Sequence, residues 1–264
     1  MSYDLCLLEQ AKKPYYIENI RTAIYSLEEL CFYLYHNIYL IDETIMNEGL
    51  CDWLRDELGL TRLYRQLYEQ LEKKDGAAYF VFPIFREAGY LTPQESREFQ
   101  EKLSNLEVQP ADVRRKLRGD YLVKEKMYGR AITQYRMILS HRNPGKLGTQ
   151  FYASVWNNLG AAYAGLFQYE YAADCFYEAW KLAGTKEIFR KYISALPLYL
   201  TEQEYEQKLK EIEADSYLVQ KIQEYNANLC LKLQPEEQVK KQMEGDIDEY
   251  LQELKEQYRR SIRN

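Results

Sequence analysis

Glycine and proline are scarce in this sequence, with 12 and 7 residues among 264. A β-sandwich or an α/β enzyme of this length needs more of both for its turns, so neither class is favoured. Hydrophobic residues make up 46% of the chain, which is enough for a sizeable core and excludes an intrinsically disordered protein. Charged residues reach 29%, a balance that is typical of a mostly helical soluble protein.

Long apolar runs are absent as well. The longest, Tyr79–Phe85, is interrupted by Pro83 and falls far short of the ~20 residues that a membrane-spanning helix needs. The N-terminus has neither the basic start nor the long apolar stretch of a signal peptide. We therefore expect a cytoplasmic protein without membrane contact.

Cysteine and histidine offer few sites for chemistry. The five cysteines are widely spread and form no C-x-x-C pair, so we expect reduced thiols rather than disulfides or a zinc site. The two histidines are His36 and His141, and no nucleotide-binding, zinc-protease or serine-hydrolase motif is present. The sequence predicts no metal, no cofactor, no catalytic residue and no enzyme activity.

The net charge of −6 hides a strong asymmetry. Residues 112–150 hold ten Lys and Arg against three acids, a balance of +7, whereas residues 201–264 hold fifteen acids against ten bases. The basic block is interpreted as a solvated helix face, and the alternative is a surface for an acidic partner or an RNA. The overall negative charge argues against general nucleic-acid binding.

Signals that start helices recur through residues 1–109. Ser26 and Glu29 form a capping box, and Asn47 is placed to cap the helix that follows it. Thr92 is the clearest cap, because a proline follows it at the first helical position and a glutamate lies three residues after the cap. The region is predicted to be a layer of four or five helices without any sheet.

The apolar segment Tyr79–Phe85 has the composition of a buried strand. No second strand candidate exists to pair with it, and the surrounding residues 76–88 have the length of a helix. We therefore predict a buried helix in which Pro83 produces a kink or a break.

Tyrosine is unusually frequent, with 26 residues. Six tyrosines cluster in the first predicted helices, and we interpret them as core residues whose hydroxyl groups reach the solvent edge. The alternative is a binding surface, where tyrosine is enriched. The six are Tyr15, Tyr16, Tyr25, Tyr33, Tyr35 and Tyr39.

Residues 110–183 contain two related units that are offset by 41 residues. In each unit a glycine is followed after 12 residues by an alanine, and an aromatic residue follows the alanine after four more. The matching pairs are Gly119 with Gly160, Tyr128 with Tyr169, Ala131 with Ala172, and Tyr135 with Phe176.

The second unit resembles a tetratricopeptide repeat, whose pattern is W-x2-L-G-x2-Y followed by A-x3-F-x2-A. Its signature residues lie at helical spacing on one face, with small residues where two helices approach closely. The first unit departs from the pattern, with Arg115 and Arg118 where tryptophan and leucine are expected. The signature residues of the second unit are Trp156, Leu159, Gly160, Tyr163, Ala172, Phe176 and Ala179.

The resemblance implies an all-α protein, a right-handed α-solenoid of antiparallel helix pairs with an N-terminal helical layer. A degenerate third pair is expected over residues 185–214. The predicted divisions are an N-terminal helical region at 1–109, the repeats at 110–234 and a long amphipathic helix at 235–264. We interpret the last segment as a capping helix, and the alternative is a coiled-coil arm that makes a homodimer.

The resemblance also implies a non-enzymatic scaffold that binds a protein or peptide in a concave groove. Four of the six expected groove residues are cationic, which favours an acidic or carboxylate-bearing segment as the ligand. Asp120 replaces the asparagine that usually follows the groove lysine in the chaperone-tail-binding subset, which weakens the case for a C-terminal carboxylate. The expected groove residues are Lys116, Lys124, Asn157, Asn158, Arg190 and Lys191.

Two other functions stay open on the sequence. Bacterial regulators that respond to a peptide or ligand resemble this solenoid, although residues 1–109 show no helix-turn-helix pattern. An RNA-binding helical repeat that uses the basic block is the third hypothesis.

Overall fold

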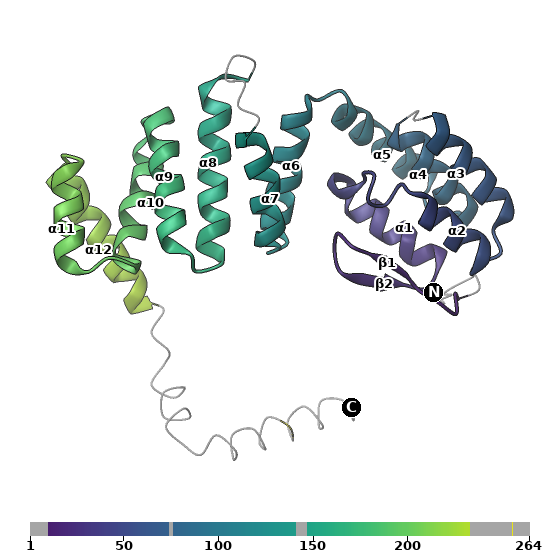
Figure 1. Ribbon diagram of the computed structural model, residues 1–264, viewed down its shortest axis with the longest axis horizontal. Coiled ribbons are helices and arrows are strands. Elements are labelled where there is room, and N and C mark those ends of the chain that lie inside the picture. The colour runs from purple at the N-terminus through teal and green to yellow at the C-terminus, as the bar shows by residue number, and fades with distance from the viewer. Residues whose placement is uncertain (1–9, 74–75, 141–146, 233–254, 256–264) are drawn as a thin grey trace. The chain divides into compact units, whose positions relative to one another are not determined.

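The computed structural model describes residues 10–73, 76–140, 147–232 and 255. The chain divides into two compact units, residues 1–168 and 169–264, and each is described by itself. The described residues are mainly helical, so the predicted all-α class is confirmed (Figure 1). None of their helices is both long and apolar enough to cross a membrane.

The expectation of no sheet is wrong, because the first unit begins with a small β-hairpin. Strands β1 (Tyr15–Ile17) and β2 (Thr22–Ile24) pair antiparallel, with Ile17 opposite Thr22. Ile17 and Ile24 are buried, so the hairpin places two isoleucine side chains in the core. Strands of three residues are too short to show the alternating pattern by which a strand is recognised in sequence.

Five α-helices and a short 3-10 turn follow the hairpin in the described part of the N-terminal region, and most begin at the predicted caps. The Ser26 hydroxyl accepts from the Glu29 N–H, and the Asn47 side chain accepts from the Leu50 N–H at 2.9 Å. Thr92 forms the complete capping box. The elements are α1 (Leu27–His36), η1 (Ile38–Leu40), α2 (Glu48–Asp56), α3 (Thr61–Lys73), α4 (Ala77–Ala88) and α5 (Pro93–Glu107).

The core of this region is built around α4, which confirms that the apolar segment is a buried helix. The helix continues through Pro83, and its residues from Phe80 to Phe85 are all buried. Phe85 meets Phe99 of α5 edge-on at 5.2 Å between ring centroids. Helices α1 and α3 also pack against α4, so the segment that looked strand-like is the centre of the helical layer.

The clustered tyrosines divide into two groups. Tyr33 is buried, and burial raises its pKa, whereas Tyr16, Tyr25 and Tyr39 are exposed. Tyr15 lies in a strand rather than a helix and exchanges hydrogen bonds with the Asn47 side chain. The interpretation as core residues therefore holds for only part of the cluster.

Three further helices complete the first unit: α6 (Ala111–Lys124), α7 (Tyr128–Ser140) and α8 (Gly148–Gly165). Figure 1 shows them side by side in chain order, with α7 packed against both of its neighbours. Helices α6 and α8 also contact each other.

The 41-residue offset is visible in the backbone. Helices α6 and α8 end 41 residues apart, and α7 begins 41 residues before α9 (Tyr169–Ala183) of the second unit. Lys126 and Phe167, which follow α6 and α8, both have a φ of +59°. Glycine is the residue that best tolerates this left-handed conformation, so both turns carry the same local strain.

Replacing Lys126 with glycine is expected to raise the free energy of unfolding by about 0.5–1 kcal/mol, since glycine relieves the left-handed strain. Urea denaturation of both proteins measures the difference. Lys126→Ala is the control and should match the parent, because alanine pays the same steric cost. Equal stability of all three proteins would contradict the left-handed backbone conformation of Lys126.

The second unit contains α9, α10 (Lys186–Ala195), η2 (Leu196–Leu198), α11 (Glu202–Glu211) and α12 (Ser216–Lys232). The main packing partners of α10 are α9 and α12, while α11 packs against η2. Phe189, Tyr192 and Ile193 form a buried apolar stripe on α10, and the buried Leu196 of η2 continues it. Apart from Lys255, the predicted helix at 235–264 lies outside the described residues, and the three predicted divisions of the chain stay predictions.

Candidate functional site

Four of the six expected groove residues lie in the first unit. Lys116 and Lys124 are on α6, and Asn157 and Asn158 are on α8. Arg190 and Lys191 are on α10 of the second unit, where the Arg190 guanidinium lies 5.2 Å from the centre of the Tyr225 ring. A shared wall of all six residues therefore stays a prediction.

Asp120 on α6 joins side chains from three helices. Its Oδ2 accepts from Lys116 Nζ at 2.6 Å, one helical turn away. Its Oδ1 accepts from the Tyr135 hydroxyl of α7 and from Asn158 Nδ2 of α8, each at 2.7 Å. The carboxylate thus fixes the positions of α6, α7 and α8 at one point.

This network of hydrogen bonds is only partly shielded from solvent. The side chains of Lys116 and Asp120 are 18% and 32% exposed, whereas Tyr135 is fully buried. Burial, with the neighbouring Asp120 carboxylate, raises the pKa of the Tyr135 phenol, so its hydroxyl keeps the proton that it donates. Hydrogen bonds to a charged acceptor are stronger than neutral ones, so the network stabilises the contact between the helices.

The same side chains retain hydrogen-bonding capacity. Asn158 uses one amide N–H on Asp120, and its Oδ1 accepts from Asn157 Nδ2 at 2.9 Å. An amide has two donors and two acceptor sites, and an ammonium has three donors, so Asn158 and Lys116 each keep hydrogen-bonding groups that no described residue uses. Lys124 lies exposed at the end of α6. We call these five residues, Lys116, Asp120, Lys124, Asn157 and Asn158, the α6–α8 surface.

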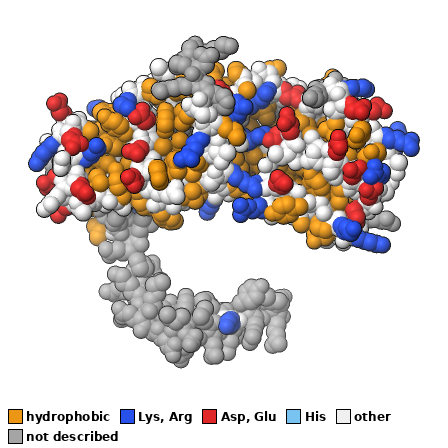
Figure 2. All heavy atoms as spheres, in the orientation of Figure 1, with side chains coloured by type: hydrophobic (Ala, Val, Ile, Leu, Met, Phe, Trp, Pro, Cys, Tyr) orange, Lys and Arg blue, Asp and Glu red, His pale blue; other side chains and the backbone are white. Residues whose placement is uncertain are grey.

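Part of the basic block is paired with acids within the fold. Arg115 pairs with Asp112 of its own helix at 3.0 Å, and Arg118 pairs with Asp42 at 2.5 Å. These arginines stand where the repeat pattern expects tryptophan and leucine, so the departures from the pattern serve ion pairs. Figure 2 shows basic and acidic side chains interspersed on the visible face, as expected of a solvated helix surface.

The signature residues of the second sequence repeat, the one that resembles a tetratricopeptide repeat, are mostly buried. Trp156 is half-buried, and the other six are buried. The described free cysteines, Cys31, Cys51 and Cys175, are buried as well. Burial raises the pKa of the Cys31 and Cys51 thiols to about 12, which makes them poor nucleophiles at neutral pH.

Candidate catalytic and metal-binding groups are sparse. Among the described residues, no group of three or more His, Cys, Asp or Glu side chains could hold a metal ion. His36 is exposed and lies against Phe32, with 4.3 Å between ring centroids, while His141 is outside the described residues.

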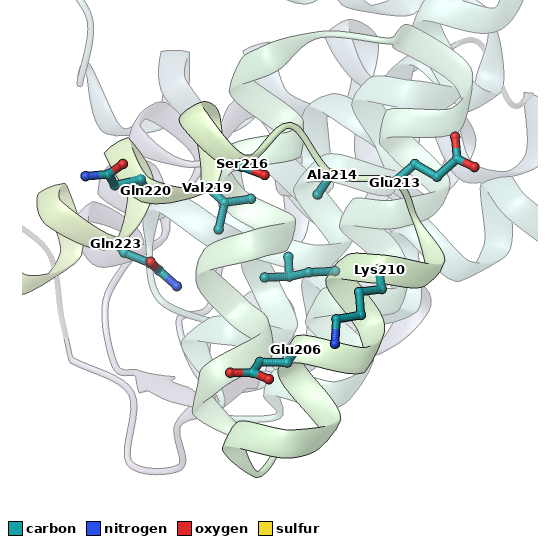
Figure 3. Close-up of a pocket in the computed structure, with 9 residues that line it drawn as sticks. Glu206, Lys210, Glu213, Ala214, Ser216, Val219, Gln220 and Gln223 are labelled. Atoms are coloured by element: carbon teal, nitrogen blue, oxygen red, sulfur yellow. The ribbon is translucent and has the colours of Figure 1, made fainter.

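The structure also reveals two hollows that the sequence did not indicate. One is a groove of about 320 Å³ between α11 and α12, where Ala214 and Val219 face the space between the helices (Figure 3). The other is a cleft of about 270 Å³ lined by the turn of the hairpin, the residues after η1, α6 and α7. The groove is lined by residues 206–223 of two consecutive helices, whereas the lining of the cleft extends from Glu18 to Gln134 over several elements, so no local motif marks the cleft.

No protein-family model, no curated protein and no solved structure matches the chain. The resemblance to tetratricopeptide repeats therefore stands on the residues and spacings of this sequence. It enters the functional argument as a proposal.

Proposed function

We propose that the chain is a non-enzymatic protein-interaction module of the tetratricopeptide type, which binds an extended peptide segment along the α6–α8 surface. The observation that carries the proposal is the half-buried network of Lys116, Asp120 and Asn158, which joins two helices and keeps donors and acceptors in reserve. An extended peptide presents backbone N–H and C=O groups, and asparagine amides bind both kinds.

The packing of the helices supports this proposal. Helix α7 packs against both α6 and α8, and α6 touches α8 directly. In solenoids of helix pairs, adjacent repeats stack and create an extended concave surface for binding. Neighbouring first helices of two pairs are the place where such a surface is expected.

Charge defines the preferred peptide. Lys116 has one carboxylate partner, Asp120, and Lys124 adds a solvent-exposed ammonium at the end of the helix. An acidic peptide segment complements these groups, and exposed ion pairs contribute about 0.2–1 kcal/mol each, so modest and salt-dependent binding is expected. Binding of RNA is less well supported, because Arg115 and Arg118 of the basic block are already paired with acids.

A displayed library of random peptides, selected on the immobilised full chain, tests the proposal. Acidic extended sequences should be enriched on the parent protein, and the enrichment should be lost on Lys124→Glu combined with Asn157→Ala. Lys102→Glu on α5 is a matched control that reverses an exposed lysine elsewhere, and it should select the same peptides as the parent. Selection that is equal on all three proteins would reject the α6–α8 surface.

A further inference from the structure

The cleft of about 270 Å³ in the first unit is bounded by three parts of the chain. Glu18 and Asn19 come from the turn of the hairpin, Asp42 and Thr44 follow η1, and α6 and α7 close the other side. Its volume lies just below the ~300–1,000 Å³ of pockets for drug-sized ligands, so its size suits a small molecule.

One side of the cleft is a closed polar network. Asp42 binds Arg118 with one oxygen and accepts from the Thr44 N–H and hydroxyl with the other. Asn19 Nδ2 donates to the Thr44 hydroxyl, and Arg118 Nε donates to the Tyr39 carbonyl at 3.0 Å. These groups satisfy one another and hold the wall in place.

Two charged residues of the lining stand outside this network. Arg130, on α7, forms no ion pair with a described residue, and its Nη1 is buried without a hydrogen-bond partner among them. Glu18, on the hairpin turn, is exposed and likewise forms no ion pair within the described part of the chain. A buried guanidinium nitrogen without an acceptor is costly, which points to a ligand that supplies one.

We propose that this cleft binds a small zwitterionic solute of the amino-acid class, with its carboxylate on Arg130 and its ammonium on Glu18. A carboxylate satisfies a guanidinium with charge-assisted hydrogen bonds, and an ammonium satisfies a carboxylate. The cleft also offers the polar side chains of Thr133 and Gln134 from α7 for the rest of the solute. This site lies apart from the α6–α8 surface and does not depend on the proposed peptide binding.

Isothermal titration of the full chain with each of the twenty free amino acids tests the proposal. At least one should bind, and Arg130→Gln and Glu18→Gln should each weaken its binding at least tenfold. Acetate and methylammonium, which carry one charge each, should bind at least tenfold more weakly than that amino acid. Arg136→Gln, an exposed arginine on the same helix outside the cleft, should bind like the parent.

Three results would overturn the proposal. One is that no amino acid binds the parent chain at 10 mM. Another is that acetate binds as tightly as the best amino acid, since the site would then recognise a carboxylate alone. The third is that, without any ligand, the stability lost in Arg130→Gln depends on whether Glu18→Gln is also present. Such coupling would mean that the two side chains pair with each other.

Discussion

Replacing Asp120 with alanine is expected to lower the free energy of unfolding by about 3 kcal/mol, because three donors lose a charged acceptor at once. The loss falls mainly on the Tyr135 hydroxyl, because its side chain is fully buried and its acceptor is this carboxylate. Lys116 and Asn158 are partly exposed, so water recovers part of their loss. Urea denaturation followed by circular dichroism measures the change.

Asp112→Ala is the matched control for this variant. It removes a carboxylate from the same helix, but the partner, Arg115, is 40% exposed, and the pair links no second helix. Such surface pairs contribute about 0–1 kcal/mol, so the control should stay close to the parent. Equal losses for Asp112→Ala and Asp120→Ala would show that the network does not hold the three helices together.

Gly119→Leu is the second change with a large expected effect. A Cβ atom at this position would lie 2.6 Å from Cε1 of the Tyr135 ring. The ring is fully buried and its hydroxyl is held by Asp120, so it has no room to retreat. Overpacking of a buried contact costs 1–3 kcal/mol and sometimes more, and a loss of about 3 kcal/mol is expected here.

Gly129→Leu separates this steric effect from the general effect of adding a side chain to a helix. Gly129 lies in the first turn of α7, and a Cβ there would meet nothing within 4 Å. Leucine favours helices more than glycine by roughly 0.5–1 kcal/mol, so this variant should be as stable as the parent or slightly more stable. A loss at position 129 as large as that at 119 would contradict the close packing of α6 on α7.

Local signals predicted most of the helical architecture. Caps at Ser26, Asn47 and Thr92 start helices in the structure because each satisfies backbone N–H groups within a few residues. The burial of residues 80–85 followed from the composition and length of the apolar segment, although Tyr79 at its start is exposed. The hairpin was missed because its pairing is decided by contacts outside its own few residues, such as the burial of Ile17 and Ile24.

The candidate site was predictable only in part. Helical spacing brought Lys116, Asp120 and Lys124 to one face of α6, and the repeat pattern singled out Asn158. The bond from Asn158 to Asp120 spans 38 residues, and that from Arg118 to the Tyr39 carbonyl spans 79. Contacts at such separations depend on how helices pack, so one sequence does not reveal them.

The most direct test of the account is the affinity of an acidic peptide from the library selection for Lys124→Glu and for Lys102→Glu, measured by fluorescence anisotropy at low and high salt. Reversing one exposed charge in the α6–α8 surface should weaken binding about fivefold at low salt and much less at high salt. The control at position 102 should bind like the parent at both salt concentrations. Equal affinities for the two variants at low salt would contradict the assignment of the α6–α8 surface as the peptide-binding site.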